Sequence, residues 1–190
     1  QHHRARLAVT QALNQAATVE CAASDILQAF CENLAWDAGF FWAVNEECNR
    51  LVCRANWHRS NLPLASFITA SCNHTFKCGE GLPGRVWDTR EPIWLPEVTL
   101  DQNFPRLASA IQEELRSFFA CPVVIGDQTI GVIEFFAQDI REPDSDFSEM
   151  MRTVVVNFGQ FVERKTAENE LRRSDYELAD LRMKPQVMVR

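Results

Sequence analysis

The chain has no long apolar run: nothing in its 190 residues approaches the roughly 18 consecutive apolar side chains that a membrane-spanning helix requires. It also has no cluster of basic residues, and its formal net charge of −7 argues against DNA or RNA as the main ligand. Neither an initiator methionine nor a signal-peptide pattern is present, so we expect an internal fragment of a longer protein. These absences predict a cytoplasmic domain that contacts neither a membrane nor nucleic acid.

Catalytic motifs are missing as well. There is no Gly-x-Ser-x-Gly nucleophile turn and no His-Glu-x-x-His, and two of the four histidines stand at the extreme N-terminus. The glycine run at residues 79–84 lacks the Gly-Lys-Ser/Thr end of a phosphate-binding loop. The sequence therefore predicts a domain without enzymatic activity of its own.

The cysteines follow no disulfide or zinc pattern. The chain has seven of them, an odd number, and none forms a Cys-x-x-Cys pair. Several stand in apolar surroundings, which is typical of reduced core thiols in a cytoplasmic protein. These are Cys21, Cys31, Cys53 and Cys121.

One polar segment places possible metal ligands close together. Cys72, His74 and Cys78 lie within seven residues, and His58 lies upstream. Cys-x-His-x3-Cys is not a standard zinc spacing, and a tetrahedral site wants four ligands. The segment is better interpreted as a polar loop with incidental thiols, so we predict no metal site. A haem ligand from His58 or His74 is equally weakly supported, because a lone histidine is more often a hydrogen-bonded surface residue.

The hydrophobic period predicts the order of the elements. The first forty residues form two helices, the second from about Glu20 to Trp36 with a broad apolar stripe. An antiparallel hairpin follows, made of an apolar strand at 39–44 and an alternating strand at 51–57. A further strand is expected at 65–70, and a polar loop follows it.

Residues 79–98 (GEGLPGRVWDTREPIWLPEV) are the most informative stretch. Gly79 and Gly81 suit a turn with unusual backbone angles, and Pro83 suits the first turn of a short helix. Pro92 ends that helix, and a short strand follows at 93–95. A second short helix is expected at 106–115.

The clearest hairpin joins residues 118–125 to 129–136 through Gly126-Asp127, a typical tight-turn pair. Pro122 predicts that the first of these strands lies at an edge or contains a bulge, because proline has no backbone N–H to donate to a central ladder. Taken together, the elements predict an α+β fold. A central antiparallel sheet of five to six strands has the N- and C-terminal helices packed on one face, and short helices and loops on the other.

The last predicted element is a long helix. It begins at Asp146, where Asp-Phe-Ser-Glu149 resembles a capping box, and runs to about Leu181. Its apolar spacing is core-like as far as Glu163, and beyond that point only four apolar residues remain, at heptad-compatible spacing. These are Ala167, Leu171, Leu178 and Leu181. We therefore predict a domain at 1–165 and a coiled-coil linker at 166–190, with a homodimer formed through the N- and C-terminal helices.

This order of elements, with its motifs, resembles the GAF domain family over roughly residues 5–165. The motifs that carry the resemblance are 79–87 (GEGLPGRVW), 92–98 (PIWLPEV), 101–106 (DQNFPR), 115–117 (LRS) before 121–123 (CPV), 131–136 (GVIEFF) and 159–165 (GQFVERK). More narrowly, the chain resembles the GAF modules of bacterial multi-domain signalling proteins, chiefly sensor histidine kinases and hybrid regulators. There, such a helix end passes into a coiled linker and then a second sensor or kinase domain.

The resemblance implies a sensory or dimerisation module that binds cyclic nucleotides, bilins, haem, small metabolites or nothing known. Bilin photoreceptors of the family carry a cysteine in the helix before the proline-containing strand, and residues 107–116 contain none, so covalent bilin attachment is not expected. The cyclic-nucleotide class carries an Asn-Lys pair that residues 137–149 lack. Methionine-sulfoxide-reducing GAF proteins show that a cysteine-based enzyme is possible on this fold. The ligand and any cofactor stay unidentified.

Aromatic side chains are the candidates for a ligand pocket between the sheet and its crossing loops. They are Trp57, Phe67, Phe76, Trp87, Trp94, Phe104, Phe118 and Phe135, with Arg85, Asp101 and Arg106 as the polar groups. The same aromatics also fit simple core packing, and the sequence leaves both interpretations open.

The expected function is a non-enzymatic sensory module of a bacterial two-component protein, which binds a small ligand or dimerises and relays a signal through its last helix. The alternatives are an unliganded dimerisation spacer, a chromophore or haem sensor, and a thiol-based redox sensor using Cys72 and Cys78.

Overall fold

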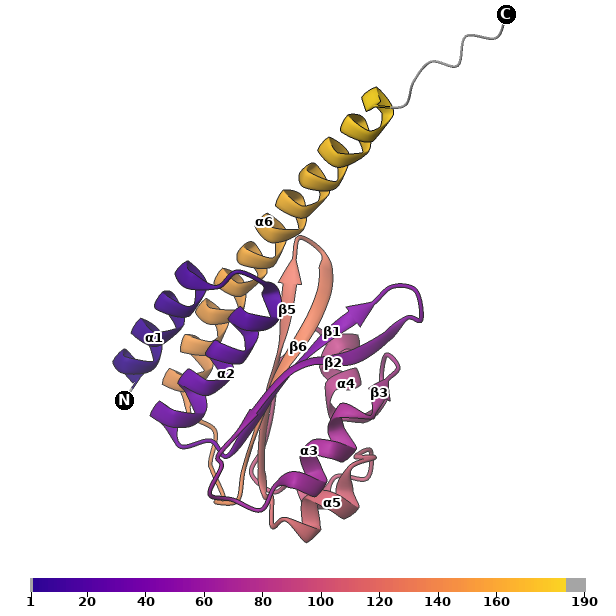
Figure 1. The fold of residues 1–190 in the computed structure, drawn as a ribbon. Coiled ribbons are helices and arrows are strands. Elements are labelled where there is room, and N and C mark those ends of the chain that lie inside the picture. Colours follow the sequence, from indigo (N-terminus) through magenta and orange to yellow (C-terminus); the bar gives the residue numbers. More distant parts are fainter. Residues whose placement is uncertain (1, 184–190) are drawn as a thin grey trace, which may run out of the picture.

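A computed structural model describes residues 2–183 and shows a six-stranded antiparallel sheet between two layers of helices (Figure 1). The strand order is β3-β2-β1-β6-β5-β4. The strands are β1 (Ala38–Asn45), β2 (Arg50–His58), β3 (Thr75–Phe76), β4 (Ile93–Leu95), β5 (Ser117–Ile125) and β6 (Gln128–Ala137). This confirms the α+β fold and the predicted number of strands. Residues 184–190 of the expected linker lie outside the described residues.

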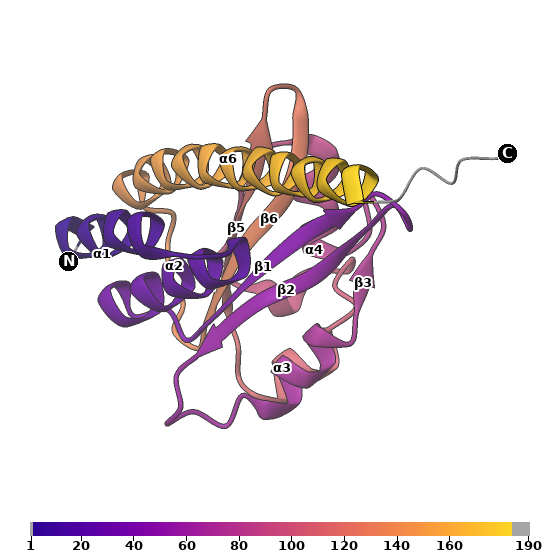
Figure 2. The same cartoon turned by 45° about the horizontal axis from the view of Figure 1, so that its top comes forward.

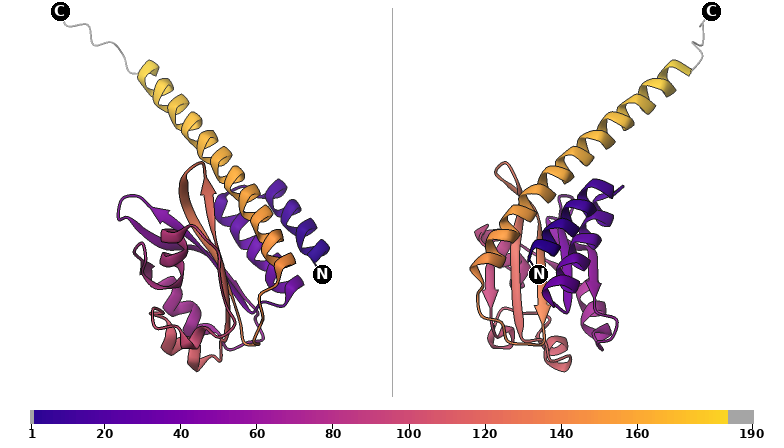
Figure 3. Two further views of the ribbon diagram at one scale, coloured as in Figure 1. Left: turned by 180° about the vertical axis from the view of Figure 1, so that it is seen from behind. Right: turned by 90° about the vertical axis from the view of Figure 1, so that its left-hand side faces the viewer.

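The helices are divided between the two faces of the sheet (Figures 2 and 3). One layer consists of α1 (His2–Gln15), α2 (Val19–Leu34) and α6 (Ser145–Met183). The opposite layer consists of α3 (Ala65–Cys72), α4 (Gly81–Thr89), α5 (Leu107–Gln112) and the 3-10 turn η1 (Val98–Leu100). The N- and C-terminal helices therefore share one face, as the sequence predicts.

Strand alternation creates two separate cores, one on each face of the sheet. On β6, Ile133 and Phe135 point toward α1, α2 and α6, whereas Val132 and Phe136 point toward α3, α4 and α5. β1 divides its aromatics in the same way, because Phe41 belongs to the first core and its sequence neighbours to the second. Both central strands are apolar because both of their faces are covered.

The expected strand at 65–70 is wrong: these residues form α3. The buried positions in this segment are Phe67 and Ser71, four residues apart, which is the spacing of one helix face. A short apolar run does not distinguish a strand from a buried helical turn by period alone. The tertiary environment decided the outcome, since α3 covers the end of the sheet beside β2.

The glycine-rich segment behaves as predicted. Gly79 and Gly81 have φ angles of +80° and +63°, a region that favours glycine, and α4 begins at Gly81 with Pro83 in its first turn. Pro122 also lies where expected. The pairing of β5 with β4 covers only Phe118–Ala120, so Pro122 stands on a local edge next to an irregularity at Val123/Val124.

The start of α6 differs from the predicted capping box. The cap is Asp144, whose Oδ1 accepts hydrogen bonds from the backbone N–H groups of Asp146 at 2.9 Å and Phe147 at 3.1 Å. The Ser148 hydroxyl adds a bond to the Asp144 carbonyl. The helix therefore starts one residue earlier, because a carboxylate two or three residues before an unpaired N–H satisfies it directly.

α6 is longer than the domain that it covers. Its 39 residues pack first against β5, α1 and α2, and the helix then continues beyond the sheet as an isolated rod (Figure 1). Within residues 2–183, no helix has the length and apolar character that crossing a bilayer would require.

Replacing the α6 cap tests this assignment. We expect Asp144→Ala to lower the free energy of unfolding by about 1 kcal/mol, because two N–H groups lose their acceptor. Asp146→Ala is the matched control and should cost less than half as much, since this exposed carboxylate only interacts with the helix dipole. Urea denaturation measures both, and an equal or larger loss in Asp146→Ala would support the capping box instead.

Candidate functional site

The predicted pocket residues do not lie in one place, because the sheet separates them. Phe67, Phe76, Phe104 and Phe118 are buried in the core beneath α3, α4 and α5, and Trp87 packs against that core. Phe135 lies in the opposite core, and Trp57 and Trp94 pack against it. Alternation along the strands prevents side chains of opposite faces from lining a common pocket. The candidate site is therefore confined to the α3–α5 face.

At the centre of this face lies a buried ion pair between Arg106 and Glu134. Their side chains are only 2% and 0% exposed. The guanidinium donates from Nη1 to Glu134 Oε1 at 2.7 Å and from Nη2 to Oε2 at 2.9 Å, which is a bidentate pairing. Arg106 comes from the loop before α5 and Glu134 from the central strand β6, so the pair connects the crossing loops to the sheet.

Two more polar groups complete this pairing. Trp42 on β1 donates its indole N–H to Glu134 Oε1 at 2.8 Å. Arg106 Nη1 also donates to the Ser71 hydroxyl of α3 at 3.0 Å. Arg106 Nε has no acceptor within the described part of the chain. The ion pair thus joins four elements at a single buried point.

Aromatic rings surround the guanidinium. Its central carbon lies 5.1–5.7 Å from six ring centroids, within the range of cation–π contact. The six rings, here called the aromatic box, are Phe40, Trp42, Phe67, Phe76, Phe104 and Phe136. A box of this kind with one carboxylate is chemically complementary to a cation, and the chain supplies that cation itself.

Arg85 and Asp101, the other two predicted polar residues, help to hold the loop that carries Arg106, together with Asn103. Arg85 of α4 pairs with Asp101 at 2.6 Å, at a partly exposed position. Asn103 accepts the Gly81 N–H at 2.8 Å and donates to the Gly79 carbonyl at 3.0 Å. The loop 101–106 is therefore fastened to the glycine-rich segment, and Arg85 and Asp101 face each other rather than a common ligand.

The possible metal ligands have separate partners. The Cys72 sulfur accepts from Asn56 Nδ2 at 3.4 Å, whereas Cys78 donates to Asp88 at 3.5 Å. Burial, and then the Asp88 carboxylate, raise the pKa of Cys78, and burial and Arg106 lower the pKa of His74. Among the side chains that the structure describes, no three histidine, cysteine or acidic residues are grouped as a metal site would require.

The space that the sequence assigns to a ligand pocket is filled by Arg106 and the aromatic box. An open surface cavity of about 720 Å³ lies beside α5, but its lining includes none of the predicted pocket residues. A ligand between the sheet and the crossing loops therefore requires Arg106 and its loop to move.

Sequence reasoning named Arg106 but missed its partners, Glu134, Trp42 and Ser71. One signal was available. Glu134 is the single charged residue in the run 129–136, and a charge in a strand covered on both faces needs a buried partner.

Comparisons with known proteins agree with this architecture. The family model described as "GAF domain" matches residues 16–163. The GAF domain of a phosphoenolpyruvate-protein phosphotransferase from Coxiella burnetii has a TM-score of 0.76 and 19% identity, covering 89% of this chain and 96% of that one. The free methionine-R-sulfoxide reductase of Neisseria meningitidis has a TM-score of 0.70 and 12% identity, covering 85% of this chain and 88% of that one.

A plant protein is similar in sequence. Transcription factor bHLH155 of Arabidopsis thaliana is 27% identical over 119 residues, which is 57% of this chain. The chain spans only 16% of the length of that relative. Since the family model covers most of the chain, this protein belongs to the GAF domain family, whose members are general sensory and regulatory modules.

Removing one partner of the buried pair should be costly. We expect Arg106→Met to lower the free energy of unfolding by about 3–5 kcal/mol, because Glu134 is left as an unpaired buried charge. The double variant Arg106→Met with Glu134→Met should lose less than Arg106→Met alone.

Arg85→Ala is the control for a partly exposed pair and should cost about 1 kcal/mol or less. Chemical denaturation measures all three variants. Additive losses in the double variant would show that the two charges are not coupled.

Proposed function

We propose that this domain is a non-enzymatic sensory module of a two-component signalling protein in the cytoplasm, which dimerises through its terminal helices and relays a signal along α6. The observation that carries the proposal is the continuation of α6 beyond its own core. Seven thiols without a disulfide fit a reducing compartment.

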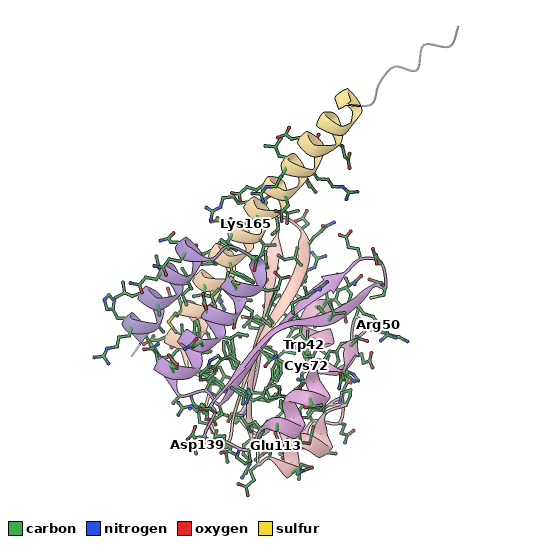
Figure 4. All side chains as sticks on the ribbon, viewed as in Figure 1. Trp42, Arg50, Cys72, Glu113, Asp139 and Lys165 are labelled. Carbon is green, nitrogen blue, oxygen red and sulfur yellow. The ribbon has the colours of Figure 1, made fainter. Side chains whose placement is uncertain are left out.

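The two parts of α6 have different surroundings. From Phe147 to Phe161 the helix buries a stripe of side chains against β5 and the N-terminal helices. From Thr166 to Asp175 every side chain is exposed, and Leu171 is 66% exposed. In Figure 4, Lys165 lies near the point where the helix leaves the domain. An isolated helix of this kind gains little from packing, so a partner helix would supply what its own domain does not.

A second copy of the chain is the partner that fits. Ala167 and Leu171 start a heptad seam, although the side chains of Leu178 and Leu181, which would continue it, lie outside the described residues. Ion pairs between Lys165 and Glu168 and between Arg173 and Glu177 stabilise the exposed helix at its sides. In a parallel pair of these helices, the apolar seam would be buried between the two helices and the charged side chains would stay in water.

The proposed relay is a population shift. α6 packs on β5, and β5 pairs with β6, which carries Glu134. A small ligand that moves the loop around Arg106 would therefore change the sheet beneath α6 and bias the register of the paired helices. Such a coupling typically amounts to about 1–3 kcal/mol.

The comparisons support a regulatory module but leave its output open. They include a phosphotransferase, a reductase and a transcription factor, which differ in activity. The two-component output belongs to the proposal and rests on the charged helix that continues from the core.

Analytical ultracentrifugation tests the dimer. We expect the chain to sediment as a dimer at micromolar concentration, and removal of residues 166–190 to weaken the dimer. Leu171→Glu should shift the equilibrium toward the monomer, because it places a charge in the seam. Asn169→Glu, which adds the same charge on the helix face opposite the seam, is the matched control and should leave the dimer unchanged. A full chain that stays monomeric at all concentrations would contradict the proposal.

A further inference from the structure

Two thiols of the α3–α5 face lie next to each other on neighbouring elements. Cys53 lies on β2 and Cys72 is the last residue of α3, and their sulfur atoms are 3.9 Å apart. Neither residue is near the other in sequence, since 19 positions separate them. Cys72 is labelled in Figure 4, where α3 lies over its face of the sheet.

The surroundings of the two sulfur atoms differ. Cys72 is exposed, and its sulfur accepts a hydrogen bond from the Asn56 side-chain amide at 3.4 Å. Cys53 is half-buried against the aromatic core, and burial, followed by the neighbouring Cys72 sulfur, raises the pKa of Cys53. Cys72 is therefore the sulfur that an oxidant reaches, and Cys53 is the protonated thiol behind it.

We propose that Cys53 and Cys72 form a reversible disulfide within the domain when hydrogen peroxide oxidises Cys72. This pair differs from the pair of Cys72 and Cys78 that the sequence suggests. The Cys78 thiol is hydrogen-bonded to Asp88, and Cys53 is the thiol in contact with Cys72.

The oxidation of the two thiols by hydrogen peroxide takes two steps. The Cys72 thiolate attacks one peroxide oxygen, the O–O bond breaks, and the products are the Cys72 sulfenic acid and, after proton uptake, one water. The Cys53 sulfur then attacks the sulfenic sulfur of Cys72. The S–S bond forms as the S–O bond breaks, and the hydroxyl leaves with the Cys53 proton as a second water. Two thiols lose two electrons in total, and peroxide becomes two waters. The sulfurs must approach by roughly 2 Å to reach the disulfide bond length.

The link would act on the centre of the domain. Ser71 precedes Cys72 and accepts a hydrogen bond from Arg106, so the disulfide would fasten the end of α3 to β2 directly beside the buried ion pair. This conclusion about the covalent bond does not depend on the dimer or on the relay through α6.

Peptide mapping of the full chain tests the proposal. Trypsin cuts after Arg50, Arg54, Arg59, Lys77 and Arg85, so Cys53, Cys72 and Cys78 fall on three separate peptides, 51–54, 60–77 and 78–85. After peroxide treatment and alkylation, we expect 51–54 linked to 60–77 as the most abundant disulfide pair. Dithiothreitol should release it, and a non-reducing gel should show a monomer.

Variants identify the order of the steps. Cys53→Ser should abolish the link and leave Cys72 as a sulfenic acid that dimedone traps. Cys48→Ser, which removes an exposed thiol elsewhere, should leave the yield of the link unchanged. Peptide 51–54 remaining unlinked in the unmodified chain, or Cys72 linked mainly to Cys78 or to another chain, would overturn the proposal.

Discussion

The buried pairing of Arg106 with Glu134 is the interaction on which the α3–α5 side of the molecule depends. It joins a crossing loop to the central strand β6, and through Trp42 and Ser71 it also includes β1 and α3. A buried guanidinium is stable only if it is paired and closely surrounded; Glu134 pairs with it, and the aromatic box surrounds it. The short helices on this face are too small to be stable alone, so the pair and its rings determine where they lie.

The opposite face depends on ordinary apolar packing. There, α1, α2 and the first part of α6 cover one core without any buried ion pair in the described residues. The two faces communicate through the strands that they share, since each residue of β5 or β6 that points to one core has neighbours pointing to the other. In the proposed relay, a change at Arg106 would pass through these shared strands to the surface on which α6 lies.

Most of the fold could be predicted from the sequence, and the failures have specific causes. Hairpins, the glycine-rich turn and the terminal helices follow from local period and turn chemistry. The segment 65–70 was misassigned because a short apolar run has no decisive period. The cap of α6 was misplaced because Asp144 and Asp146 are both acceptable N-cap residues, and only the backbone path selects one. The sequence pointed to Arg106 but not to Glu134, because Arg106 lies in a recognisable motif whereas its partner lies on a strand far away in the sequence.

What the sequence determined by itself is the elements outside residues 65–76, the GAF resemblance and the length of α6, because each is encoded in residues that are close along the chain. What only the tertiary structure decided is which distant residues meet: Glu134 with Arg106, 28 positions apart, and Cys53 with Cys72, 19 positions apart. The pairing partners of a buried charge or a thiol depend on strand register and on the face to which each side chain points. Register is a property of the assembled sheet, so no local pattern specifies it completely.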